Sequence, residues 1–541
     1  QSFRRLVEWE KKIFATSFSE VDATFLKQCK QLGFSDEMLA KAWSVTPADV
    51  RSLRKKFGIV PAYKLVDSSA GEFEAKAAYF YSSWSGESDV QPDRSKKKIL
   101  ILGSGPIRIG QGIEFDYCSV QGIQCVQRLG YEAIIINNNP ETVSTDYATA
   151  DRLYFEPLTL EDVLNVIDVE DVEGVIVQVG GQTAISLVEG LEKAGVRIFG
   201  TNLDTIDQLE DRGRFYSFMR EIGVPHIPGM TAENEEEALQ FAKEIGYPVL
   251  IRPSYVIGGQ GMMLFHSENE LRDYFNDEEL LMPFPVLIDA YYEGTEFDVD
   301  ALTDGENVCV AGIFEHVERA GVHSGDSIAV TPPHRAAKEV KELIYEYTEK
   351  IAKGMDFRGI FNIQFVYYKG TLYVIEINPR ASRTVPILCK VTKEPLIDHT
   401  IKLLLGASLK ELGLPKTALA EREFYTVKAP IFSYEKLNGL DPLLEAEMKS
   451  TGELMSISDD LDEAFYKAFA WSQAAIPKFY KKKGTIFVDV AEQHRARFQP
   501  YAERLKEIGF QLTSASFQKW VQSDDAIALI SLPRRGTDDG K

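Results

Sequence analysis

Cysteine is scarce in this sequence of 541 residues. The five cysteines are odd in number, lie far apart and never form a C-x-x-C pair: Cys29, Cys118, Cys125, Cys309 and Cys389. Disulfide frameworks and structural zinc sites both need cysteines at regular spacings. The pattern therefore predicts neither, and we interpret the thiols as reduced packing residues.

Long apolar runs are also missing. No stretch approaches the roughly 18 apolar residues that cross a bilayer, and the N-terminus lacks the basic-then-apolar pattern of a signal peptide. We therefore expect no membrane association and a cytoplasmic location. The chain begins at Gln1 and not at Met, which is consistent with a fragment or a processed product.

Positive charge is in deficit. Lys and Arg number 60 against 82 Asp and Glu, giving a formal net charge of −22. A chain of this charge repels a phosphate backbone, and the sequence has no Lys/Arg stripe that offsets the repulsion. We expect no nucleic-acid binding, and any phosphate ligand must meet a local positive site.

The composition is that of a globular protein, with 44% hydrophobic and 26% charged residues. The length predicts about three or four domains. Residues 1–88 show helix caps, at Ser35 before Asp36 and at Thr46 before Pro47, and predict a small all-α region. Residues 83–97 are rich in polar residues, Gly and Pro, and indicate a linker.

Short apolar runs then alternate with helical stretches, which predicts a parallel α/β domain over 98–205. Residues 206–406 predict an α+β domain with antiparallel hairpins, and 407–483 a mainly helical extension. The tail, 484–541, shows one β-α-β signal. The predicted strands after the linker are 99–102, 133–136, 174–177, 197–199, 249–252, 286–289, 297–302, 307–314, 360–367, 371–377, 485–490 and 526–531.

Three polar loops follow strands of the predicted parallel sheet. The first contains Gly103, Gly105 and Gly110, but Arg108 occupies the third glycine of a dinucleotide fingerprint, so that reading fails. The others are 137–142 and 178–183. All three would meet at the carboxyl edge of the sheet; a glycine-rich turn there is either structural or faces a ligand.

A second glycine cluster lies between two predicted strands. Residues 253–262 read PSYVIGGQGM and include Gly258 and Gly259. Backbone N–H groups of such a hairpin can close over phosphate oxygens because no Cβ obstructs them. A flexible hairpin without a ligand is the alternative.

Strand register predicts a metal site. In a hairpin turning near Gly370, Gln364 and Glu376 face each other across two strands. Asn378 is two residues beyond Glu376 and points to the same face. Three oxygen-bearing side chains suit a hard cation that also holds phosphates, whereas a solvated sheet face is the alternative.

Arg380 and Arg383 follow, three residues apart, as on a helical turn. Beside a metal they would neutralise a transferring phosphoryl group; a surface ion pair is the alternative. His323 lies in a glycine-bounded loop with Ser324 and Asp326. No G-x-S-x-G elbow accompanies it, so a hydrolase triad is disfavoured.

These segments, in this order, resemble the C-terminal half of the carbamoyl-phosphate synthase large chain. The matching stretches are ILGSGPIRIGQGIEFDY (101–117), NNNPETVSTDYATADRLYFEPLTLEDVL (137–164), QVGGQT (178–183), EDRGRF (210–215), RPSYVIGGQGM (252–262), AGVHSGDS (320–327) and EINPRASRTVP (376–386). The resemblance spans about residues 20 to 480.

The resemblance implies an ATP-grasp fold that uses ATP to phosphorylate carbamate, giving carbamoyl phosphate for arginine or pyrimidine synthesis. It implies Mg²⁺ or Mn²⁺, and K⁺, as cofactors. The metal residues would be Gln364, Glu376 and Asn378, and the catalytic residues Arg214, Arg380 and Arg383. The nucleotide site would comprise Arg214, Arg252, Gly258, Gly259, Tyr292, Glu296, Gly321, Val322, His323, Ser324, Gln364 and Glu376.

The implied partners are an N-terminal synthetase half that supplies carbamate and a glutaminase small subunit, in an oligomer. Residues 1–88 resemble a shortened oligomerisation domain, and 484–541 a shortened, methylglyoxal-synthase-like allosteric domain. The middle of the effector site is missing from that tail, which disfavours effector control. Ala290 stands where we expect a longer polar side chain near adenine.

Two other functions compete. One is another ATP-grasp carboxylate ligase, such as a biotin-carboxylase-like or D-alanine-ligase-like enzyme; the long matches at 101–117 and 137–147 disfavour it. The other is a non-catalytic nucleotide-binding assembly module. The complete set of metal and arginine residues disfavours that reading.

Overall fold

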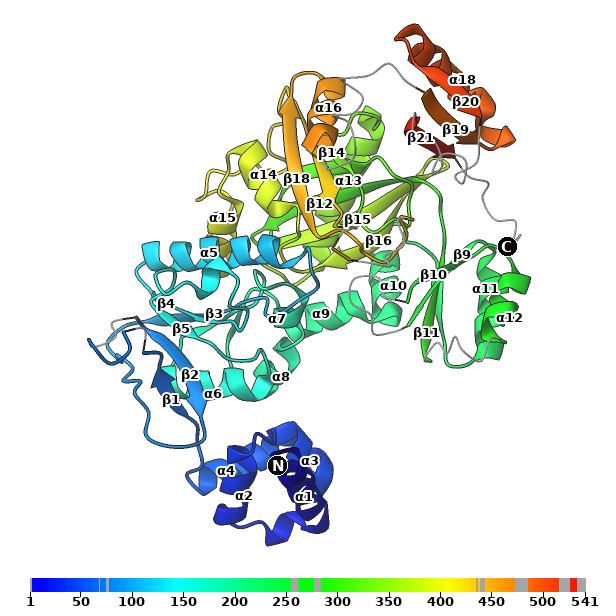
Figure 1. Ribbon diagram of the computed structural model, residues 1–541. Helices are drawn as coiled ribbons and strands as arrows, with labels where there is room; N and C mark the ends of the chain where they lie inside the picture. Colours follow the sequence, from blue (N-terminus) through cyan, green and yellow to red (C-terminus); the bar gives the residue numbers. More distant parts are fainter. Residues whose placement is uncertain are drawn as a thin grey trace. The chain divides into compact units, whose positions relative to one another are not determined.

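The computed structural model describes residues 2–67, 69–73, 77–253, 261–276, 284–433, 436–437, 443–471, 485–514 and 526–532 (Figure 1). The chain divides into two compact units, Gln1–Leu461 and Asp462–Lys541.

The first unit begins with four short α-helices: α1 (Ser2–Ala15), α2 (Ala23–Gln31), α3 (Asp36–Trp43) and α4 (Pro47–Lys56). The predicted caps are confirmed. The Ser35 side chain accepts a hydrogen bond from the Met38 amide. Thr46, which precedes Pro47, forms a capping box with Asp49. These caps satisfy amides that a helix start leaves unpaired, so local sequence sets the boundaries.

The prediction of an all-α region over 1–88 is wrong beyond α4. Strands β1 (Ala62–Leu65) and β2 (Tyr79–Ser83) pair antiparallel, and β2 then pairs parallel with β5 (Arg152–Tyr154). The ring of Tyr63 packs edge-on against Tyr154, with 4.9 Å between centroids. This contact joins residues far apart in the sequence, so a local pattern could not predict it.

The predicted parallel sheet is confirmed. Its central strands are β3 (Lys98–Leu102), β4 (Glu132–Ile136), β6 (Gly174–Ile176) and β7 (Ile198–Phe199), and the full order is β1-β2-β5-β4-β3-β6-β7. Every residue of β3 is buried. Helices therefore cover both faces: α5 (Gly112–Arg128) packs on one, and α6 (Leu160–Glu170) and α8 (Val188–Lys193) pack on the other.

A smaller four-stranded sheet has the order β10-β9-β11-β8. Its elements are β8 (Gly229–Ala232), α11 (Glu235–Ile245), β9 (Val249–Pro253), β10 (Met263–Phe265), α12 (Glu268–Phe275) and β11 (Val286–Ala290). Strands β9 and β10 pair antiparallel on either side of the glycine-rich segment. The predicted hairpin is therefore confirmed, although residues 254–260 lie outside the described part of the chain.

A second seven-stranded sheet is antiparallel, with the order β16-β15-β12-β13-β14-β17-β18. Its strands are β12 (Thr295–Thr303), β13 (Val308–His316), β14 (Ala329–Thr331), β15 (Gly359–Tyr368), β16 (Thr371–Asn378), β17 (Tyr425–Ile431) and β18 (Gly452–Ser458). The predicted helical character of 407–483 is wrong because β17 and β18 add two strands to the sheet. Within that range α16 (Leu461–Trp471) is the one helix among the described residues.

The two faces of this sheet differ. One face packs in an apolar cluster with α10 (Arg212–Glu221) and α13 (Lys338–Gly354). On the other, α14 (Val385–Thr392) and α15 (Leu396–Leu404) pack between the sheet and α5. The rest of this second face carries polar side chains. They include Asp300, which lies beside the start of α14, and Asp298 and Glu296 further along β12.

The second unit contains β19 (Thr485–Val490), α18 (Glu492–Glu507), β20 (Gln511–Ser514) and β21 (Ala526–Leu532). The strands are parallel in the order β20-β19-β21. The predicted β-α-β pattern is confirmed, and β20 is a strand that the sequence analysis missed.

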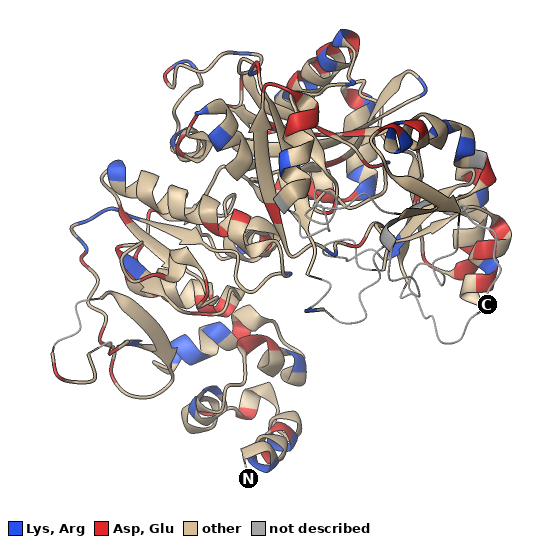
Figure 2. Cartoon of the chain, turned by 45° about the horizontal axis from the view of Figure 1, so that its top comes forward, with Lys and Arg blue, Asp and Glu red and all other residues tan. Residues whose placement is uncertain are grey.

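Many charged residues lie on the helices (Figure 2), and among the described residues the helices are too short or too polar to cross a membrane. Acidic and basic side chains are interspersed along the helices, whereas most residues of the sheets are uncharged (Figure 2). Among the described residues, none of the helices has the length and apolar character needed to cross a membrane.

Candidate active site

The polar face of the antiparallel sheet arises from alternation in β12. Glu296, Asp298 and Asp300 point to one face, whereas Phe297 and Val299 enter the apolar cluster on the other. All three acids are at most 8% exposed. Buried carboxylates need partners, and those partners identify the site.

Strand pairing brings the predicted metal residues together (β15 and β16 in Figure 1). Gln364 pairs directly with Glu376, and Asp298 of β12 pairs with Gln364. The Asn378 side-chain amide donates to the Glu376 carboxylate at 3.0 Å. The register predicted from sequence is therefore confirmed.

This donor set fits a hard divalent cation only in part. It offers one carboxylate and two amide oxygens, and the described residues contain no group of three or more His, Cys, Asp or Glu that could hold a metal. Mg²⁺ keeps six oxygen ligands and commonly takes several of them from phosphates and water. The site therefore suits a cation that arrives with a nucleotide.

Arg380 lies beside this set. Its guanidinium donates to Asn378 Oδ1 at 3.2 Å and to Gln182 Oε1 at 3.3 Å, and it stacks over the Phe115 ring. Residues 379–384 form a turn between β16 and α14, so the predicted helical turn is wrong. Gln182 comes from the third polar loop of the parallel sheet, which therefore contacts the arginine.

Arg383 points toward a second loop. Its guanidinium donates to Ser324 Oγ at 3.2 Å and to Met448 Sδ at 3.1 Å. The Lys428 ammonium donates to the Ser324 carbonyl at 2.8 Å. Burial and the neighbouring Arg383 and Lys428 charges hold the pKa of His323 well below its usual value, so His323 is neutral at pH 7.

Glu114 is an acid that lies near the cations Arg383 and Lys428. Its side chain is buried, and Oε2 has no hydrogen-bond partner. Burial and the nearby Glu453 charge raise the pKa of Glu114 to about 7, although Arg383 and Lys428 oppose the shift. This carboxyl group therefore changes charge near neutral pH beside the two cations.

The loop 320–327 is held by the acids of β12. The Gly321 amide donates to Glu296 at 3.0 Å, and His316 bridges Glu296 at 3.2 Å and Asp298 at 2.9 Å. Gly321 has φ +89°, and an added Cβ would lie 2.6 Å from the Tyr291 ring. A glycine is required there, and the next residue, Val322, is buried.

An apolar surface adjoins this loop. Tyr292 stacks on Tyr368 with 4.9 Å between centroids and contacts a small cluster that contains Ala290, Ala320 and Val366. Ala290 is buried in this cluster. The unexpected alanine therefore contributes an apolar surface and not a polar contact.

The two other predicted arginines differ in their surroundings. Arg252 approaches Asp289, with 3.7 Å between Nε and Oδ2. Arg214 is 43% exposed and pairs with Asp204 at 2.6 Å. Arg212 instead lies inward, donating to Asp289 at 3.2 Å; Asp289, Tyr216 and Glu376 together outweigh its burial and raise its pKa.

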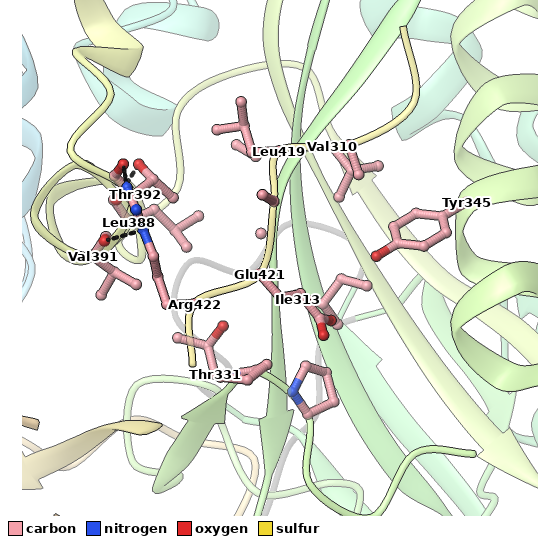
Figure 3. A pocket seen from close by; sticks show the side chains of 16 residues that line it. Val310, Ile313, Thr331, Tyr345, Leu388, Val391, Thr392, Leu419, Glu421 and Arg422 are labelled. Atoms are coloured by element: carbon pink, nitrogen blue, oxygen red, sulfur yellow. Dashed lines mark hydrogen bonds between the residues drawn. The ribbon is translucent and has the colours of Figure 1, made fainter. Parts of the chain in front are cut away.

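The predicted site residues Gly258 and Gly259 lie in the segment 254–260, outside the described residues. A small cavity of about 30 Å³ does lie in the described region, against β13 and α14 (Figure 3). Its lining includes Val310, Leu388 and Arg422, and none of the predicted site residues. It has room for about one water molecule and none for a nucleotide.

Three family descriptions match consecutive parts of the chain. Residues 1–58 match the carbamoyl-phosphate synthetase large chain, oligomerisation domain. Residues 95–208 match the carbamoyl phosphate synthase preATP-grasp domain, and 211–412 match the carbamoyl-phosphate synthase L chain, ATP binding domain. The chain belongs to the carbamoyl-phosphate synthase large-chain family. The family resemblance inferred from the sequence motifs is thus confirmed.

Two relatives carry the name carbamoyl phosphate synthase arginine-specific large chain. The protein from Halalkalibacterium halodurans is 58% identical over 544 residues, covering 100% of this chain and 52% of its own length. The protein from Geobacillus stearothermophilus is 49% identical over 532 residues, covering 98% and 50%. The chain therefore spans about half the length of these relatives.

Solved structures support the ATP-grasp fold of this family member. A biotin carboxylase–β-γ-ATP complex from Campylobacter jejuni matches with a TM-score of 0.53 at 18% identity, covering 69% of this chain and 90% of the other. The biotin carboxylase domain of the Hydrogenobacter thermophilus 2-oxoglutarate carboxylase matches with a TM-score of 0.51 at 23% identity, covering 64% and 77%. At these identities the likeness concerns the fold alone.

Sequence motifs missed several residues that the structure brings to the candidate site. These are Glu114, Arg212, Asp298, Asp300, His316 and Lys428. The run EFDVDA at 296–301 contains a signal for two of them, because acids and apolar residues alternate with a period of two. Lys428 had no such signal, because it lies on a strand where a helix was predicted.

Proposed function

We propose that this chain is the carbamate-phosphorylating, C-terminal synthetase half of a carbamoyl-phosphate synthase. It uses ATP and Mg²⁺ to convert carbamate to carbamoyl phosphate, and the names of its relatives favour a role in arginine synthesis. Mn²⁺ in place of Mg²⁺, and K⁺, remain predictions. One observation carries the proposal: the metal-type residues, Arg380, Arg383 and the 320–327 loop converge on one sheet face.

Each part of the face has a role in this reaction. The Tyr292 surface suits an adenine ring, and Glu296 orders the loop beside the nucleotide. Gln364, Glu376 and Asn378 would hold the cation, which supplies charge neutralisation to the phosphates when bound. The predicted roles of Arg214, Arg252, Gly258 and Gly259 in nucleotide binding also remain predictions.

The chemistry is an in-line phosphoryl transfer. A carbamate oxygen attacks the γ-phosphorus of ATP, the bond from that phosphorus to the β–γ bridging oxygen breaks, and ADP leaves with the electron pair. No protein nucleophile is needed, so catalysis rests on positioning and charge. Arg380 and Arg383 are placed to neutralise charge on the transferring group and on the carbamate.

The test is the reverse half-reaction, formation of ATP from ADP and carbamoyl phosphate with Mg²⁺. We expect the chain to form ATP and Glu376→Ala to abolish this activity, because the only carboxylate of the predicted metal set is lost. The matched control is Glu342→Ala on the exposed face of α13, which should keep the wild-type rate. Glu376→Ala with unchanged turnover would remove the metal assignment.

A wild-type chain that binds ADP tightly but forms no ATP would contradict catalysis by the isolated chain. It would favour either a unit that needs its other synthetase half or a non-catalytic module. The proposed partners, a preceding half that supplies carbamate and a glutaminase subunit, would then be tested by adding them. The oligomerisation match over residues 1–58 supports an oligomer.

A further inference from the structure

Asp300 is a buried acid that the proposed reaction does not use. It is 0% exposed and lies on the same face of β12 as Glu296 and Asp298. Its Oδ2 accepts a hydrogen bond from Thr384 Oγ1 at 2.5 Å, and its Oδ1 accepts one from the Asn362 amide at 3.2 Å. Asp300 therefore joins the sheet to the end of the loop 379–384.

Thr384 departs from the usual geometry of a helix N-cap when it makes this contact. It is the N-cap residue of α14, where a threonine normally accepts a bond from an amide of the first turn. Here it makes no side-chain cap bond, and its backbone is helical instead of extended. The hydroxyl instead donates to Asp300, while Ser382 lies 2.8 Å from it. A local rule broken without local gain is expected at functional sites.

The strand beside Asp300 has a glycine that allows α14 to pack closely against it. Gly312 pairs with Asp300 across β12 and β13. A Cβ on Gly312 would lie 2.3 Å from Leu388 Cδ2, so only glycine lets the helix approach this closely. The hydrogen bond from Thr384 to Asp300, called the tether below, and the small Gly312 both place the start of α14 against the polar face.

The loop ending at Thr384 carries both arginines. Two of its main-chain contacts go to the parallel α/β domain: the Ala381 amide donates to the Gln178 carbonyl at 2.9 Å, and Thr201 donates to the Pro379 carbonyl at 3.1 Å. Arg380 contacts Asn378 at the start of the loop, and Asp300 adds a contact at its end, from β12 of the same sheet. Asp300 acts on the residue next to Arg383.

We infer that Asp300 is a positioning residue which, through Thr384, holds Arg380 and Arg383 in register with the metal-type residues and so sets the affinity for the anionic carbamoyl group. The inference rests on the proposed function. A misplacement of about 1 Å in a phosphoryl-transfer site can lower the rate about a hundredfold. Tyr292, proposed to contact adenine, lies between β11 and β12 and stacks on Tyr368, so the KM for ADP should not respond.

The test compares three threonine variants of the whole chain in the ATP-forming half-reaction. Thr384→Val removes the hydroxyl and keeps the volume, whereas Thr384→Ser restores the hydroxyl. Thr392→Val is the matched control, because Thr392 is buried at the other end of α14 and donates to the Leu388 carbonyl. Asp300→Asn alters the same tether from the other side.

We expect Thr384→Val to lower kcat/KM for carbamoyl phosphate by about tenfold or more, with the KM for ADP nearly unchanged. Thr384→Ser should recover most of the loss, and Thr392→Val should behave as wild type. Equal effects of Thr384→Val and Thr392→Val would overturn the inference. So would an equal change in the KM for ADP.

Hydrogen exchange without substrate separates this inference from the proposed function. The backbone amides of 380–384 should exchange faster in Thr384→Val and in Asp300→Asn, but not in Thr384→Ser or Thr392→Val. Faster exchange in a chain that forms no ATP would preserve the tether and contradict catalysis by the isolated chain. Unchanged exchange in both tether variants would overturn the inference, whatever the activity.

Discussion

His316 shows how individual residues combine in this site. It is 2% exposed and lies between Glu296 and Asp298, with ring nitrogens 3.2 and 2.9 Å from their carboxylates. Burial disfavours its charge, but the two acids outweigh burial and raise its pKa to about 9. The protonated His316 ring thereby stabilises the carboxylate of Glu296, which accepts a hydrogen bond from the Gly321 amide.

This raised pKa predicts the pH dependence of stability. An imidazole whose folded pKa lies above its unfolded value, about 6.5, contributes stability fully below that value and loses it as pH rises through 9. We expect the free energy of unfolding to fall by up to about 3 kcal/mol between pH 6.5 and 9.5, and the melting temperature to fall with it.

His316→Gln should flatten this part of the melting profile. His334→Gln is the control: burial lowers the pKa of His334, so its contribution changes only at lower pH. A wild-type slope retained in His316→Gln would show that another group is responsible.

Gly321 gives a second prediction at this scale. Gly321→Ala should raise the KM for ADP about tenfold, because its φ of +89° is unfavourable for alanine and the Cβ would displace Tyr291. Gly370→Ala is a matched control with φ +87° and nothing within 4 Å. Steady-state kinetics with both variants would separate backbone strain from displacement of the ring; equal KM values would contradict this prediction.

At the scale of elements, buried charges connect α4 with α6. Arg54 is 0% exposed and donates to Asp36 at 2.8 Å and to Asn165 at 2.8 Å. Lys30 pairs with the same Asp36 at 3.0 Å and with Glu161 at 2.6 Å. The N-terminal helices are thus joined to the parallel α/β domain by a closed network.

Arg54→Met should therefore destabilise the chain by about 3 kcal/mol, because it leaves Asp36 and Asn165 buried with partners missing. Lys55→Met removes a neighbouring, partly exposed pair with Asp168 and should change stability by less than about 1 kcal/mol. Thermal melts of both variants test this. Similar melting temperatures for the two would mean that burial does not distinguish these pairs.

At the scale of the whole molecule, the described site residues all belong to one unit. Arg214 to Arg383, and Lys428 beyond them, fall within Gln1–Leu461. The second unit contributes a small parallel sheet and none of the predicted site residues. Its strands β19 to β21 can therefore be tested as dispensable for the chemistry.

A chain shortened to end after Trp471 should form ATP from ADP and carbamoyl phosphate at a rate within about twofold of the full chain, since the removed part contains none of the predicted site residues and independent parts contribute additively. Initial rates at saturating ADP provide the measurement. A loss of activity with an unchanged melting temperature would assign a catalytic contribution to residues beyond 471.

Much of the fold and the candidate site was predictable wherever local rules decide. Caps at Ser35 and Thr46 set helix starts, and the period of two placed Gln364, Glu376 and Asn378 on one face. Predictions were wrong for β2 and β17, whose partners β5 and β14 lie far away in the sequence. Pairing across such distances leaves no periodic signal at short range.

By itself, the sequence determined the four central strands of the parallel sheet, the glycine hairpin, the register of Gln364 with Glu376 and the family, because each depends on neighbouring residues or on long matching motifs. Only the tertiary structure decided that Lys428 and Glu114 join Arg383, that Arg212 lies inward while Arg214 is exposed, and that Asp300 holds Thr384. These are contacts between buried charged or polar groups from separate elements. Their energy depends on distance and burial, which no spacing along the chain specifies.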